Sequence, residues 1–138
     1  GGDHHSLPLF YDKKSQETEF CDVDMIILKD NKVKVIFEIE ESGFHPIKVC
    51  GKFLASALSK HYDGNHELDE NVLFIQVLDT SKLEEKSNKP GQWKNLEKAI
   101  QNIIPVKESR INEYKLYALC VKDDFNKMLK DIEEFLKK

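Results

Sequence analysis

The feature that most constrains this chain is the stretch from Cys21 to Glu41, which predicts a β-hairpin. The first arm, Val23 to Leu28, is almost wholly apolar. The second arm, Val33 to Ile39, is rich in β-branched and aromatic residues, which suit a pleated, half-buried strand. A polar turn containing Asp30-Asn31 separates the arms, and both residue types tolerate turn geometry. The sequence therefore predicts two antiparallel strands joined by this turn.

Acidic residues lie at the far end of both arms of this hairpin. If the turn centres on Asn31, Asp24 lies opposite Glu38 and Asp22 lies opposite Glu40. Side chains two apart on a strand share a face, so the four carboxylates are expected to project together. Like charges opposite each other destabilise a sheet, and the cluster therefore indicates a bound cation. Mg²⁺ prefers one or two carboxylates together with waters and substrate phosphates. The alternative is that these acids are simply solvated.

In the rest of the chain, the spacing of apolar residues alternates between that of strands and that of helices. Helical spacing of apolar residues predicts helices over 47–62, 93–104 and 125–136, while apolar runs predict strands over 7–11, 72–78 and 114–121. Polar residues predict loops over 12–19 and 80–91. Within the first helix, the expected buried stripe contains Ile47, Phe53 and Leu54, and within the last, Asp123 or Asp124 is expected to cap the helix start. Strands that alternate with helices in this way favour an α/β fold with parallel strands.

Length and composition bound the function as well. The 138 residues fit one domain, 1–138, in which residues 1–6 are expected to be flexible. His4 and His5 lie in that segment, as part of a flexible terminus or, alternatively, as metal ligands. Three widely spaced cysteines and the lack of a membrane-spanning apolar segment are typical of a cytoplasmic protein. The net charge of −4 does not indicate a nucleic-acid binder, because such proteins usually carry a broad basic surface.

One pattern in the hairpin resembles a known family. Asp24, a hydrophobic strand, a turn, a second hydrophobic strand and Glu38-Ile39-Glu40 are followed by a helix and a strand. This order resembles the PD-(D/E)XK nuclease superfamily, which includes type II restriction endonucleases and archaeal Holliday-junction resolvases. The superfamily core is a mixed β-sheet of αβββαβ type flanked by helices. The resemblance covers residues 7–78, and it implies an α/β domain of restriction-endonuclease-like fold.

The resemblance also implies roles for individual residues. Asp24 and Glu38 correspond to the metal ligands of the family, and Glu40 stands where most members carry Lys. Some restriction enzymes have Glu at that position, and other members supply a lysine from the following helix, here Lys48 or Lys52. The implied activity is hydrolysis of DNA phosphodiester bonds with Mg²⁺ or Mn²⁺ as cofactor. DNA is then the partner, no membrane is involved, and a homodimer or larger complex would supply specificity.

Two other functions fit the same residues. The first is a non-catalytic member of the same fold that binds nucleic acid or a protein partner. The acidic net charge and the absence of the family's lysine favour it. The second is an unrelated α/β binding domain in which the acids of the hairpin are solvated. A divalent ion held between Asp24 and Glu38 would distinguish the nuclease from both alternatives.

Overall fold

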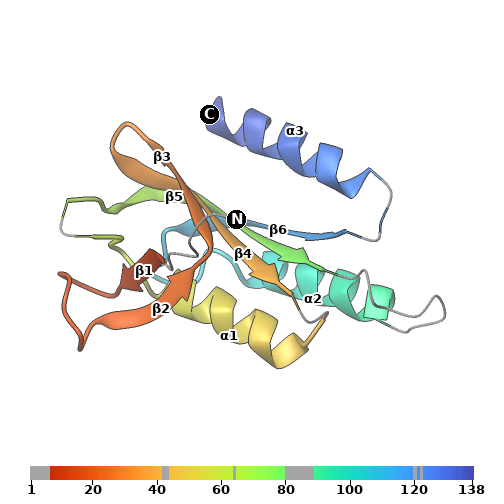
Figure 1. Cartoon of the computed structure of the whole chain (residues 1–138), viewed down its shortest axis with the longest axis horizontal. Helices are drawn as coiled ribbons and strands as arrows, with labels where there is room; N and C mark the ends of the chain where they lie inside the picture. Colours follow the sequence, from red (N-terminus) through yellow and green to blue (C-terminus); the bar gives the residue numbers. More distant parts are fainter. Residues whose placement is uncertain (1–6, 42–43, 64, 80–88, 120, 122) are drawn as a thin grey trace.

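The fold is a mixed sheet with helices on both faces (Figure 1). The computed structural model describes residues 7–41, 44–63, 65–79, 89–119, 121 and 123–138, so the expectations for residues 1–6, with His4 and His5, lie outside it. Strands β3, β4, β5 and β6 form one four-stranded sheet in that order, and β1 pairs with β2 separately. The elements are β1 (Leu7–Phe10), β2 (Glu19–Val23), β3 (Met25–Lys29), β4 (Lys32–Glu40), α1 (Pro46–Ala57), β5 (Leu68–Leu78), α2 (Lys89–Ile103), β6 (Ile111–Ala118) and α3 (Asp124–Leu136).

The β3–β4 hairpin confirms the predicted antiparallel pairing and the turn at Asp30-Asn31. Lys29 pairs with Lys32, so the turn is centred between Asp30 and Asn31 and not on Asn31. A register shift between Ile27 and Leu28 then gives the pairing of Met25 with Phe37 that the sequence predicted. The turn residues Asp30 and Asn31 have φ angles of 53° and 67°. A tight hairpin turn of this kind needs positive φ at both central residues, and Asn and Asp adopt that conformation more readily than other side chains.

The first arm of the predicted hairpin is divided at Asp24. The residues before it form β2, which pairs with β1 so that Asp22 lies opposite Pro8. The predicted pairing of Asp22 with Glu40 is therefore wrong. The break has a packing reason, because Val23 is buried in the core beneath α1 whereas Ile27 packs in the core beneath α3.

Strand β5 lies between β4 and β6 and is parallel to both, as the sequence predicted. Helices α1 and α2 cover one face of the sheet and α3 covers the other (Figure 1), which explains the continuous apolar sequence of the strand. Gln76 interrupts that sequence and is fully buried. Its Nε2 donates a 3.1 Å hydrogen bond to the carbonyl of Val49 in α1, and its Oε1 accepts one from the Tyr114 hydroxyl. These bonds attach α1 to the sheet.

Several helix ends differ from their predicted positions. Helix α1 ends at Ala57, and the segment Pro90-Gly91, which was expected in a loop, lies in the first turn of α2. Asp123 precedes α3 without capping it through its side chain, and the Asp124 carboxylate accepts a hydrogen bond from the Ala118 N–H instead. No helix in the described part of the chain is long and apolar enough to cross a membrane.

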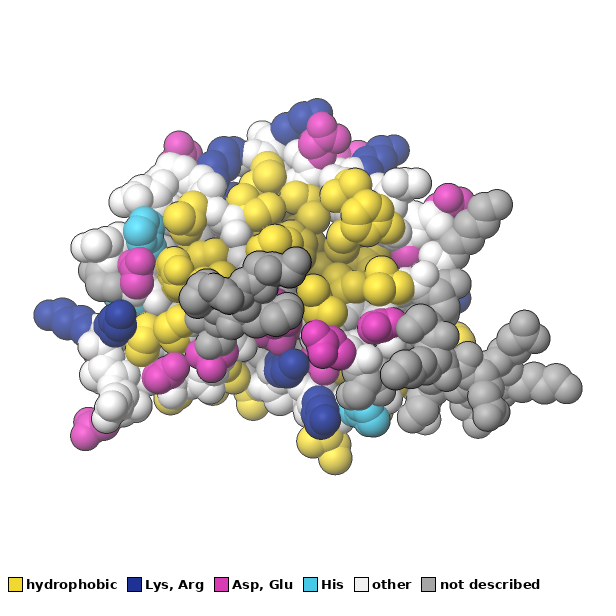
Figure 2. Space-filling model, in the orientation of Figure 1, with side chains coloured by type: hydrophobic (Ala, Val, Ile, Leu, Met, Phe, Trp, Pro, Cys, Tyr) yellow, Lys and Arg dark blue, Asp and Glu magenta, His cyan; other side chains and the backbone are white. Residues whose placement is uncertain are grey.

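Helix α3 covers its face of the sheet incompletely. Its buried residues are Met128, Ile132 and Phe135, whereas Phe125 and Leu129 are half exposed. On the same face of the sheet, Met25 and Ile39 are also exposed. Figure 2 shows hydrophobic side chains gathered between α3 and the β3–β4 hairpin. This face of the molecule therefore keeps an apolar surface in contact with solvent.

Candidate functional site

The candidate site lies at the C-terminal end of β4, on the face of the sheet that α1 covers. Glu38 and Glu40 follow Ile36 at alternate positions, and Ile36 belongs to the core beneath α1. The carboxyl ends of parallel strands are where ligands usually bind in open α/β sheets. Glu38 and Glu40 are only 2% and 4% exposed, which is unusual for carboxylates and requires compensation of their charge.

Lys52 of α1 supplies that compensation. Its Nζ lies 3.0 Å from Oε2 of Glu38 and 3.0 Å from Oε1 of Glu40, so one ammonium group bridges two buried carboxylates. The Lys52 side chain is 39% exposed, and the bridge is therefore accessible to solvent from one side. Of the two candidate lysines, the structure brings Lys52 to the acids and leaves Lys48 exposed on the helix surface.

The position of Lys52 follows from the way α1 packs. The buried face of the helix contains Val49, Phe53 and Ser56, and Lys52 follows Val49 by three positions, so it projects from the same side. The stripe predicted from the sequence is wrong in part, because Ile47 is 88% exposed and Leu54 is half exposed. Ser56 belongs to the buried face because it packs beside β2, where its Oγ lies 3.8 Å from the Cys21 sulfur.

Asp24 is tied to the same part of β4. Its Oδ2 accepts a 2.7 Å hydrogen bond from the N–H of Ile39, and its own N–H donates to the carbonyl of Phe37 at 3.1 Å. Its carboxylate is therefore held beside the strand that carries Glu38 and Glu40. Asp24 itself is exposed, so this carboxylate faces solvent where the two glutamates do not.

The electrostatics of the site are dominated by burial. Burial raises the pKa of Glu38 to about 7, against the lowering effect of the hydrogen bond and charge of Lys52. Partial burial disfavours the charged form of Lys52, but hydrogen bonds to Glu40 and Glu38 raise its pKa above the ordinary value. Oε1 of Glu38 is buried and has no hydrogen-bond partner among the described residues. A buried acceptor without a partner is costly, and a cation bound at this oxygen would remove that cost.

The oxygens at this site fit a hard divalent cation in their chemistry. Asp24 offers an exposed carboxylate, Glu38 offers its unpartnered Oε1, and Mg²⁺ prefers oxygen ligands of this kind. Within the described residues, no group of three or more His, Cys, Asp or Glu side chains is spaced to hold a metal ion. Lys52 lies between Glu38 and Glu40.

The other acids of the predicted cluster are not part of the site. Asp22 is exposed and lies on β2, and Glu41, which follows the cluster in sequence, is exposed as well. Gln76, which the sequence analysis missed, lies directly beside Glu38 in the β4–β5 ladder. A polar residue in the middle of an otherwise apolar strand is the sequence signal that could have revealed it.

The raised pKa of Glu38 predicts a pH dependence of stability. An unfolded glutamate titrates near pH 4.5, and Glu38 in the fold titrates near pH 7. The folded state therefore binds the proton more tightly than the unfolded state. The stability that protonated Glu38 contributes to the fold is fully present below about pH 4.5 and is lost as the pH rises through about 7. Glu38→Gln should remove it. We expect the melting temperature in EDTA to fall by about 5 °C more in the parent than in Glu38→Gln between pH 5.5 and 8. Parallel pH profiles of the two proteins would contradict the assignment.

No family model, no curated protein and no solved structure matches this chain.

Proposed function

We propose that this protein is a divalent-metal-dependent nuclease of restriction-endonuclease-like fold, which hydrolyses DNA phosphodiester bonds. One observation carries the proposal: Lys52, from the helix after β4, contacts both Glu38 and Glu40 at 3.0 Å. This is the arrangement that the resemblance to the PD-(D/E)XK superfamily implies when the lysine comes from that helix. The element order from β3 to β5, an antiparallel pair followed by a helix and a parallel strand, supports the same proposal.

Each residue has a role in the proposed reaction. Bound Mg²⁺ or Mn²⁺ would supply Lewis acidity at the phosphoryl oxygen and lower the pKa of its water. Asp24 and Glu38 would hold the cation through their carboxylate oxygens. Glu40 would accept the proton of the attacking water as a general base. The Lys52 ammonium would give up part of its contact with the two glutamates and would offset the negative charge that develops on the phosphate.

The alternative is a domain of the same fold that binds DNA or a protein without cleaving. The acidic net charge of −4 favours it. In that case the contact of Lys52 with Glu38 and Glu40 is a structural ion pair, and no cation is needed. Binding of a divalent cation therefore separates the two functions.

Calorimetric titration with Mn²⁺ tests the proposed site. We expect one binding site in the parent and none in Asp24→Asn. The amide keeps an oxygen that can accept the hydrogen bond from the Ile39 N–H but lacks the charge. Asp22→Asn is the matched control, because Asp22 is an exposed acid two positions away that lies outside the site. Equal loss of Mn²⁺ binding in both variants, or binding that survives Asp24→Asn, would refute this assignment of the ligands.

A further inference from the structure

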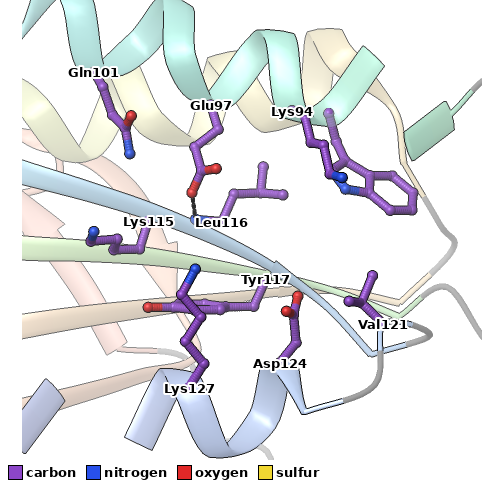
Figure 3. Close-up of a pocket in the computed structure, with 10 residues that line it drawn as sticks. Lys94, Glu97, Gln101, Lys115, Leu116, Tyr117, Val121, Asp124 and Lys127 are labelled. Carbon is purple, nitrogen blue, oxygen red and sulfur yellow. Dashed lines mark hydrogen bonds between the residues drawn. The ribbon is translucent and has the colours of Figure 1, made fainter. Parts of the chain in front are cut away.

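A polar cavity of about 440 Å³ lies along the outer edge of β6 between α2 and α3 (Figure 3). The edge of the strand is already covered by side chains. The N–H of Leu116 donates to Oε2 of Glu97 at 2.7 Å, and the N–H of Ala118 donates to Oδ2 of Asp124 at 3.0 Å. Gln101 donates to a carbonyl of the same strand at 2.9 Å. Because these bonds occupy the edge, the cavity is not suited to an added peptide strand.

Three lysines give the cavity its ligand chemistry. Lys94 comes from α2, Lys115 from β6 and Lys127 from α3, and all three line the same cavity. Their ammonium groups make no hydrogen bond, and no ion pair within 4.0 Å, with the described residues. Burial raises the pKa of Glu97, and the nearby charges of Lys115 and Lys127 oppose that rise. Figure 3 shows the Lys127 side chain extending from α3 toward β6 and α2. Ammonium groups of lysines bind phosphates as point charges.

The charge balance of the cavity supports an anionic ligand. Glu97 and Asp124 bring two carboxylates, each of which already accepts a main-chain N–H of β6. Three ammonium groups therefore face two carboxylates whose hydrogen-bonding capacity is partly used. This local excess of positive charge occurs in a chain whose net charge is −4. A buried tryptophan, Trp93, forms part of the wall.

The cavity lies level with the candidate site along the strands. In the sheet register, Glu38 is beside Gln76 of β5, and Gln76 is beside Leu116 of β6. Neighbouring strands are about 4.8 Å apart, so the backbones of Glu38 and Leu116 are separated by about 10 Å across the sheet.

We infer that the cavity at the edge of β6 binds backbone phosphates of the same DNA that is cleaved at the Asp24–Lys52 site. This inference rests on the proposed function. Lys115 and Lys127 neutralise phosphates other than the scissile one, and Lys94 extends the contact along α2. The contacts position the strand without reading its sequence.

The test compares a double variant of the cavity with a matched control. Lys115→Gln/Lys127→Gln removes two lining charges, and Lys98→Gln/Lys130→Gln removes two exposed lysines of α2 and α3 that do not line the cavity. Binding of a fluorescein-labelled DNA duplex is measured by anisotropy in EDTA over a range of salt concentrations. We expect the cavity variant to bind the duplex at least about tenfold more weakly than the parent. The plot of log affinity against log salt concentration should also be less steep, by about 1.8. The control should stay within about twofold of the parent.

Trp93, the only tryptophan of the chain, reports directly on the cavity. Unlabelled duplex should change its fluorescence in the parent and in the control but not in the cavity variant. An equal change with inorganic phosphate alone, with no further effect of DNA, would overturn the inference in favour of a free-phosphate site. Unchanged DNA affinity in the cavity variant, with cleavage intact, would also overturn it and leave the proposed function standing. Absence of DNA binding and cleavage in the parent would refute the proposed function itself.

Discussion

Lys52→Met should lower the melting temperature of the protein in EDTA at pH 8 by about 10 °C. Methionine keeps the length and apolar stem of lysine but leaves Glu38 and Glu40 buried without a cation. Removing one partner of a fully buried ion pair costs about 3 to 5 kcal/mol. Lys52 is 39% exposed, so water reaches the pair, and we expect a loss of about 2 to 3 kcal/mol.

A divalent cation should reverse part of this loss. Mn²⁺ would replace the missing positive charge beside the carboxylates, so it should raise the melting temperature of Lys52→Met more than that of the parent. Lys48→Met is the control, because Lys48 is exposed one helical turn earlier and should change stability by no more than about 0.5 kcal/mol. If Lys52→Met is as stable as Lys48→Met, the buried charges of Glu38 and Glu40 are compensated in some other way.

Asp24→Asn should reduce Mg²⁺-dependent DNA cleavage by at least about a hundredfold. Replacing a residue that only supports a metal ligand typically lowers activity by about 10- to 100-fold, and replacing the ligand itself should lower it by more. The substitution is nearly isosteric and retains an acceptor for the N–H of Ile39, so the fold should stay intact. Asp24→Ala should lose the same activity and also stability, by about 1 kcal/mol, since the hydrogen bond disappears. A comparison of the two variants separates the catalytic loss from the structural one.

The hairpin was predictable because its information is local. Asp30-Asn31 determines where the turn lies, and a register shift between Ile27 and Leu28 brings Met25 opposite Phe37. This register places Asp24 alongside β4 near Glu38, and both residues were identified as candidates on that basis. The parallel arrangement of β4, β5 and β6 likewise follows from the alternation of strands and helices.

The break at Asp24 and the choice of lysine depend on contacts far apart in sequence. Val23 and Met25 are both apolar, and nothing in the local pattern shows that the chain changes sheets between them. The rotation of α1 is set by Val49 and by contacts with β2 and Gln76, and only this rotation distinguishes Lys52 from Lys48. The cavity at the edge of β6 joins α2, β6 and α3, so it has no signature in any one segment.

Nicking of supercoiled plasmid is the measurement that tests the central claim most directly. The parent, Asp24→Asn and Asp22→Asn would be incubated side by side at low salt, each with Mg²⁺ and with EDTA. The proposed nuclease predicts nicking by the parent and Asp22→Asn in Mg²⁺ and none in EDTA, with Asp24→Asn inactive in both. Nicking that is equal in the parent and Asp24→Asn, or a folded parent that nicks no DNA with Mg²⁺ or Mn²⁺, would contradict it.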